Sequence, residues 1–209
     1  MTPTLTDCLL IIDVQNDFCP GGALEVPTGD EVVPLINRLT HHFSHRILTQ
    51  DWPPPGHLSF ASSHAQAAPL ETIELDYGTQ VLWPDHCVQC TRGAEFHPAL
   101  GTANCELILR KGFRRAIDSY SAFFENDKIT ATGLSGYLRT RGFDRLYLTG
   151  LALDFCVLYS ALDGQREGFT VQVIEDASRA IDVDGSLADA QRQMDQAGVT
   201  RIQSTDLDR

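Results

Sequence analysis

Short apolar runs alternate along the chain with segments in which apolar residues recur every three or four positions. Five of these runs are nearly continuous, at residues 8–12, 46–50, 105–109, 145–148 and 170–174. A short continuous run is typical of a strand covered on both faces, as in a parallel sheet. The pattern therefore predicts five buried strands, most of them followed by a polar or charged residue.

Between the runs lie four apolar stripes with helical spacing, within residues 32–39, 134–138, 157–162 and 187–197. Strands that alternate with amphipathic helices predict an α/β fold, a three-layer sandwich with a mostly parallel sheet. No repeat or flexible linker divides the chain, so residues 1–209 are predicted to form a single domain. The run Pro53-Pro54-Pro55 is interpreted as a rigid loop.

The composition excludes several classes of partner. The 209 residues include 28 acidic and 16 basic side chains, a net charge of −12. Nucleic acids and anionic membranes attract clustered Lys and Arg, so neither is expected as the main partner. The sequence has no transmembrane stretch and no recognisable signal peptide. Six cysteines are too sparse for a disulfide scaffold. We expect reduced thiols and a cytoplasmic location; a homo-oligomer is left open.

Reactive side chains stand where the predicted strands end. Asp13, Asp51 and Lys111 each lie at the carboxyl end of a strand, and Cys156 lies near the start of a helix. In open α/β sheets the site lies beyond the carboxyl ends of the strands. Free N–H groups and the dipole at a helix N-terminus stabilise a thiolate, so we expect a lowered thiol pKa for Cys156.

These side chains suffice for acyl transfer. Cys156 can be the nucleophile, Asp13 the base, and Lys111 the cation that holds Asp13 ionised. Backbone N–H groups of Ala152 and Cys156 can form the oxyanion hole. Taken singly, each residue has a plainer interpretation as a small core residue, a turn former or a solvated cation. Their combination at three strand ends favours catalysis.

Several blocks of the sequence resemble blocks of the nicotinamidases and occur in the same order as in that family. Nicotinamidases belong to the isochorismatase-like cysteine hydrolases. The resemblance extends from about residue 8 to about residue 182. It rests on Asp13–Phe18 with Gly21–Leu24, Thr49–Trp52, Leu82–Gln89, Arg110–Phe113, Asp118–Phe123, and Gly150–Ala152 with Asp154–Val157. It implies a six-stranded, Rossmann-like parallel sheet and a cis peptide at Leu151–Ala152.

The resemblance also implies a reaction. The family triad corresponds to Asp13, Lys111 and Cys156, and the expected reaction converts nicotinamide and water into nicotinate and ammonia through a thioester on Cys156. Pyrazinamide is expected as a second substrate, with NAD salvage as the context. The substrate-binding residues are predicted to be Phe18, Leu24 and Trp83, although core packing is the commoner fate of an aromatic residue.

Nicotinamidases also hold a divalent metal beside the pyridine nitrogen. The resemblance places its ligands at Asp51, His57 and His86, whereas Pro53 stands where the family has a further histidine. Proline offers no side-chain ligand. One carboxylate and two imidazoles suit Zn²⁺, Fe²⁺ or Mn²⁺. We expect a weakened metal site that assists substrate binding; the alternative is an empty site in which both histidines only form hydrogen bonds.

Other functions remain open. Cys90 and Leu153 depart from the family pattern, and Cys90 creates a Cys87-x-x-Cys90 motif. We interpret this motif as incidental, because it does not begin a helix after a strand as redox motifs do; a disulfide under oxidation is the remaining role, and a redox function ranks last among the alternatives. A related cysteine hydrolase acting on another small amide, a ureide or a vinyl ether is the main alternative. A binding protein that has kept the fold ranks lower because Asp13, Lys111 and Cys156 are all present.

Overall fold

A six-stranded sheet forms the centre of the computed structural model, which describes residues 2–207. Its strands are β1 (Asp7–Ile12), β2 (His45–Asp51), β5 (Leu107–Lys111), β6 (Arg145–Leu151), β7 (Thr170–Arg179) and β8 (Thr200–Ile202). The order across the sheet is β5-β2-β1-β6-β7-β8, and every neighbouring pair is parallel. The five predicted strands are confirmed, together with the six-stranded sheet that the resemblance implied.

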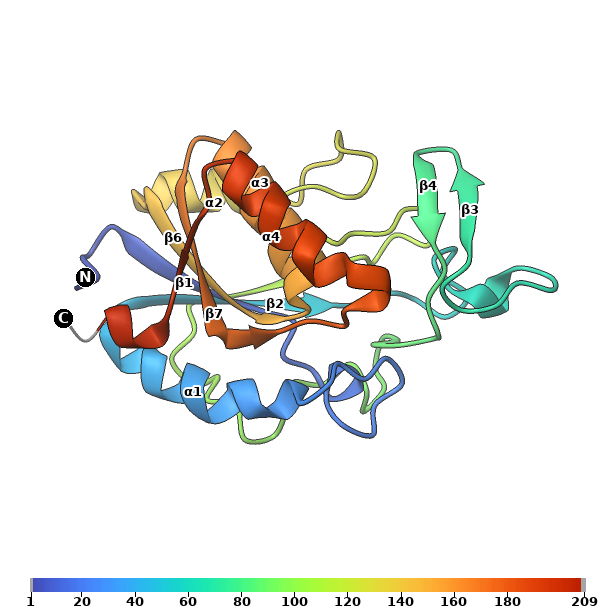
Figure 1. Cartoon of the computed structure of the whole chain (residues 1–209), viewed down its shortest axis with the longest axis horizontal. Helices are drawn as coiled ribbons and strands as arrows, with labels where there is room; N and C mark the ends of the chain where they lie inside the picture. Colours follow the sequence, from blue (N-terminus) through green and yellow to red (C-terminus); the bar gives the residue numbers. More distant parts are fainter. Residues whose placement is uncertain (1, 208–209) are drawn as a thin grey trace.

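Helices cover both faces of the sheet (Figure 1). One face carries α1 (Val32–Leu39), and the other carries α2 (Leu134–Arg141), α3 (Leu158–Arg166) and α4 (Ser186–Gln196). Successive residues of β1 point to opposite faces: Leu9 and Ile11 pack in the core under α1, while Leu10 and Ile12 pack in the other. Burial on both faces explains the continuous apolar runs, and it confirms the three-layer sandwich.

Three features of the fold were not predicted by the hydrophobic pattern. Strand β7 extends five residues beyond the predicted end, to Arg179, and the short strand β8 was not predicted. A separate antiparallel hairpin consists of β3 (Thr72–Leu75) and β4 (Gly78–Val81). Its strands are only partly buried and contain polar residues, so they lack the pattern of core strands. In Figure 1 the hairpin projects at one end of the molecule.

The carboxyl ends of the strands bring the candidate residues together. Asp13 follows β1 directly, and Asp51 and Lys111 are the paired last residues of β2 and β5. Strand β6 ends at the expected cis peptide, Leu151–Ala152. The chain then makes one wide helical turn, Leu153–Val157, before α3 begins. Within the described residues, no helix is long and apolar enough to cross a membrane.

Candidate active site

A small cavity opens at this edge of the sheet. Most of the residues proposed from the sequence contribute to its lining, and Asp13 lies fully buried beside it. The lining consists of Phe18, Leu24, Asp51, Trp83, His86, Lys111, Asp118, Ser119, Tyr120, Ala152, Phe155, Cys156 and Ile181. The cavity therefore brings a cysteine thiol, charged groups and aromatic walls together in one place.

Lys111 is the centre of the polar network. Its Nζ lies 2.9 Å from Asp13 Oδ2, 3.0 Å from Asp51 Oδ1 and 3.4 Å from Cys156 Sγ. It also donates to the carbonyl oxygen of Ser119 over 2.7 Å. Lys111 is 1% exposed. An ammonium ion so deep in the protein needs compensating charge and acceptors, and both carboxylates and the carbonyl supply them.

The two carboxylates differ in their electrostatics. Burial raises the pKa of Asp13, and Lys111 opposes that effect. Burial alone would also raise the pKa of Asp51, but Lys111 and His86 lower it to about 2. Burial alone would lower the pKa of Lys111, yet Asp13 and Asp51 raise it well above its usual value. Asp13 is thus the carboxylate of the pair with the greater affinity for a proton, as a general base requires.

Asp13 is held in place by a residue that the sequence analysis did not single out. The hydroxyl of Thr49, on β2, donates to Asp13 Oδ1 over 2.6 Å and accepts the Asp13 backbone N–H. Asp13 Oδ2 therefore stays available to Lys111 and to the nearby thiol of Cys156. Thr49 belongs to the block Thr49–Trp52, which carried part of the family resemblance, but no individual role followed from it, because threonine is common in strands.

The expected lowering of the Cys156 pKa is wrong for this structure. Cys156 lies inside the wide turn rather than at the first turn of α3, and it is 7% exposed. Burial raises the pKa of its thiol well above the usual value, and Asp13 adds to this effect while Lys111 opposes it. Desolvation outweighs the helix terminus because it penalises the thiolate directly. A raised pKa means that nucleophilic attack by this thiol needs a base to remove its proton.

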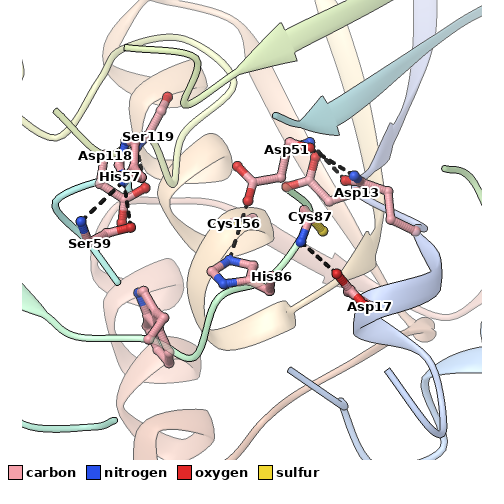
Figure 2. A network of polar contacts seen from close by, with 12 residues as sticks. Asp13, Asp17, Asp51, His57, Ser59, His86, Cys87, Asp118, Ser119 and Cys156 are labelled. Carbon is pink, nitrogen blue, oxygen red and sulfur yellow. Dashed lines mark hydrogen bonds and ion pairs between the residues drawn. The ribbon is translucent and has the colours of Figure 1, made fainter. Parts of the chain in front are cut away.

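The predicted set of three metal ligands is not assembled. His86 Nε2 lies 3.4 Å from Asp51 Oδ2, whereas His57 interacts elsewhere. His57 Nδ1 lies 2.7 Å from Ser59 Oγ (Figure 2), and its Nε2 lies 3.3 Å from the carbonyl oxygen of Ile117. Among residues 2–207, no three His, Cys, Asp or Glu side chains form a group that could hold a metal ion. The residues present do not fit the metal, because both ring nitrogens of His57 already have partners.

Phe18, Leu24 and Trp83 line the cavity, which is where the sequence analysis placed the substrate. Two further aromatic residues join them: Phe155 packs edge-on against Trp83, with ring centroids 4.9 Å apart, and Tyr120 lies 6.2 Å from Trp83. The block Asp118–Phe123 carried part of the family resemblance, but no individual role followed from it.

Cys87 and Cys90 are free thiols.

Comparisons with known proteins identify the family. The isochorismatase domain matches residues 7–206. The chain belongs to the isochorismatase family. It is 52% identical over 199 residues to a nicotinamidase of Acinetobacter baylyi, covering 95% of this chain and 93% of that protein. A nicotinamidase/pyrazinamidase structure from Acinetobacter baumanii has a TM-score of 0.97 and 54% identity, covering 98% of this chain and 99% of that one.

Two other similar structures contain ligands. The PnC1 protein of L. infantum is in complex with nicotinate, with a TM-score of 0.86, 36% identity, and coverage of 98% of this chain and 96% of that one. The pyrazinamidase of Pyrococcus horikoshii is in complex with zinc, with a TM-score of 0.76, 31% identity, and coverage of 95% and 99%. Relatives of this chain thus bind a small aromatic acid and a divalent metal.

Proposed function

We propose that this protein is a nicotinamidase that converts nicotinamide and water into nicotinate and ammonia, with residues 1–209 acting as a single domain. The observation that supports this most strongly is Lys111 Nζ, which lies 2.9 Å from Asp13 and 3.4 Å from Cys156 at the wall of a small aromatic cavity. The 52% identity to a nicotinamidase supports the choice of substrate. Pyrazinamide, with a similar ring and the same amide, is the proposed second substrate.

The proposed first half-reaction begins with the neutral thiol. Asp13 accepts the proton from Cys156 Sγ as sulfur attacks the amide carbon, and the carbonyl oxygen becomes an oxyanion. The N–H groups of Ala152 and Cys156 stabilise that charge. When the C–N bond breaks, Asp13 gives the proton to the departing nitrogen, which leaves as ammonia. A thioester between the acyl group and Cys156 remains.

The second half-reaction regenerates the enzyme. Asp13 accepts a proton from water while the water oxygen attacks the thioester carbon. The C–S bond then breaks and Asp13 returns its proton to Cys156 Sγ, while the carboxylic acid product loses its own proton to solvent and leaves as nicotinate. Lys111 keeps Asp13 oriented in both halves, because it contacts that carboxylate directly. Assaying ammonia release from nicotinamide tests the proposal: equimolar ammonia and nicotinate support it, and release from a different amide alone contradicts it.

A pH profile tests the role of Asp13. Burial raises the pKa of Asp13 above the ordinary aspartate value of 3.8. The acid-side fall in kcat/KM is therefore expected at a pH above 3.8. Thr49→Val removes a hydrogen bond that favours the ionised form, so the acid limb should move to still higher pH. Thr149→Val is the matched control, because Thr149 is equally buried and bonds Ala177 instead. If the acid limb of the Thr49→Val profile stays at the same pH as in the wild type, the assignment of Asp13 as the base is contradicted.

Pro53 offers a test of why the residues present do not fit a metal. Pro53 is buried in the segment that follows Asp51. Pro53→His adds an imidazole where the family has one, so it is expected to raise the affinity for Zn²⁺ about tenfold or more, measured by calorimetry. Pro54→His, one residue further along the same loop, is the control and should leave the affinity unchanged. Equal affinity in wild type and Pro53→His would show that position 53 does not limit metal binding.

The proposed partners are small molecules, in keeping with the nicotinate held by one similar structure. The cytoplasmic location and the absence of nucleic-acid and membrane partners stay predictions from the sequence. No observation in the structure favours a related hydrolase, a binding protein or a redox protein over the nicotinamidase.

A further inference from the structure

The carboxylate of Asp17 joins two loops that are far apart in the sequence. Asp17 lies in a short helical turn, Asn16–Phe18, after β1. Its Oδ2 accepts the backbone N–H of Cys87 over 2.7 Å (Figure 2), and its Oδ1 accepts the backbone N–H of Ala23 over 3.2 Å. Its backbone carbonyl accepts the N–H of Leu24 over 3.0 Å. One residue thus connects three segments of the chain.

Each of these segments carries a residue of the cavity lining. Phe18 follows Asp17 directly, and Leu24 and His86 each stand next to a residue whose N–H the carboxylate accepts. The rings of Phe18 and His86 pack against each other, with centroids 5.4 Å apart. The place of one carboxylate therefore sets the relative positions of three lining residues.

The loop that carries His86 depends on this contact. The next residue, Cys87, has a φ of +49°, which lies in the left-handed region. A residue with a side chain adopts that conformation only at a cost in free energy. The N–H of Cys87 donates to a charged acceptor, and such hydrogen bonds are stronger than neutral ones. Asp17 therefore offsets part of the cost and favours this conformation of the loop.

Gly93 leaves the space that the carboxylate occupies. A Cβ at position 93 would lie 2.0 Å from Asp17 Oδ2 and 2.4 Å from Oδ1, far inside contact distance. The carbonyl of Gly93 also accepts the backbone N–H of Asp17 over 3.0 Å. Asp17 is thus fixed by contacts on both its backbone and its side chain, although it does not line the cavity itself.

We propose that Asp17 is a positioning residue, which holds Phe18, Leu24 and His86 together as one wall of the cavity and so sets the affinity for the substrate. This inference rests on the proposed hydrolysis of nicotinamide. Asp17 acts through its neighbours and not on the reacting atoms. The base, Asp13, is held by Lys111 and Thr49 instead.

Asp17→Asn keeps the shape of the side chain but only one of its two acceptors. The amide oxygen can accept one backbone N–H, and the NH₂ group then faces the other. KM for nicotinamide is expected to rise about tenfold, because a hydrogen bond to a charged group is lost. The value of kcat should stay within about threefold of the wild-type value. Steady-state kinetics of ammonia release measure both quantities.

Gly93→Ala tests the same role with the carboxylate still present. The new Cβ takes the place of Oδ2, so Asp17 must turn away from Cys87, and a similar rise in KM is expected. The backbone at Gly93 is not left-handed, so it accommodates alanine. Gly136→Ala, in α2, is the matched control: a Cβ there has open space among residues 2–207, and KM should not change.

Asp176→Asn is the control for the change of charge. Asp176 is half-buried like Asp17 and accepts the backbone N–H of Ser204 over 2.8 Å, but it does not line the cavity. Thermal unfolding shows whether each variant is folded; if Asp17→Asn is not, Gly93→Ala carries the test. A purely structural role would reduce the folded fraction without changing KM. An unchanged KM, or a loss confined to kcat, would overturn the inference.

Binding separates this inference from the proposed function. Calorimetry with the Cys156→Ala protein measures the affinity for nicotinamide without turnover. Binding that weakens about tenfold when Asp17→Asn is added supports the inference. Absence of ammonia release by the wild type, together with this weaker binding, would contradict only the proposed hydrolysis. Equal affinities with and without Asp17→Asn would overturn the role of Asp17 whatever the wild type hydrolyses.

Discussion

Cys156→Ala is expected to lower kcat for nicotinamide by on the order of 10⁴-fold or more, because no other group can form the thioester. Sγ is the only sulfur in the cavity lining, and it lies 3.4 Å from Lys111 Nζ. Binding of nicotinamide should change little, since the walls of the cavity stay in place. Ammonia release and calorimetry on the same preparation measure the two effects separately.

Cys87→Ala is the matched control for this substitution. Cys87 is fully buried, and burial raises the pKa of its thiol well above the usual value, as it does for Cys156. Cys87 does not line the cavity, however, so its removal should leave kcat within about twofold of the wild-type value. Substantial turnover by Cys156→Ala, or a loss in Cys87→Ala as large as that in Cys156→Ala, would contradict the assignment of the nucleophile.

Lys111→Met is expected to cost about 3–5 kcal/mol of the free energy of unfolding, in addition to activity. The side chain neutralises Asp13 and Asp51, over 2.9 and 3.0 Å, and all three groups are nearly or fully buried. Without the ammonium ion, two carboxylates remain in a region of low dielectric with no cation between them. Urea unfolding of the wild type and the variant at neutral pH measures the loss.

The second lysine of the chain provides the comparison. Lys128 Nζ lies 3.3 Å from Asp163, and its side chain is 36% exposed, so Lys128→Met should cost about 1 kcal/mol or less. Adding Asp13→Asn to Lys111→Met removes one stranded charge and should recover part of the lost stability. If Lys111→Met lowers the free energy of unfolding no more than Lys128→Met does, the network of Lys111, Asp13 and Asp51 does not stabilise this edge of the sheet.

Periodicity in the sequence predicted the architecture because burial and periodicity are directly linked in a parallel sheet. Residues 8–12 are apolar throughout, since Leu9 and Leu10 face different helical layers. Periodicity did not predict the short or polar strands. Residues 200–202 form a strand only three residues long, at the edge of the sheet, and the β3–β4 hairpin contains too many polar residues to give a strand signal.

The residues of the candidate site also differ in whether the sequence could predict them. Asp13, Lys111 and Cys156 could be predicted because they are reactive residue types at strand ends and match a family motif. Thr49 could not, because its role depends on Asp13, which lies 36 residues away and which only the folded chain brings near. His57 matched a motif spacing, but its ring bonds Ser59 and Ile117. Spacing alone does not reveal where an imidazole points.

The central claim is a thioester between the acyl group of nicotinamide and Cys156. Acid quenching during turnover, followed by mass spectrometry of the peptides, tests it most directly. The expected result is a nicotinoyl adduct on the peptide that contains Cys156, present during turnover and gone once nicotinamide is exhausted. Release of ammonia with no adduct on Cys156, or with an adduct on a different residue, would contradict the account.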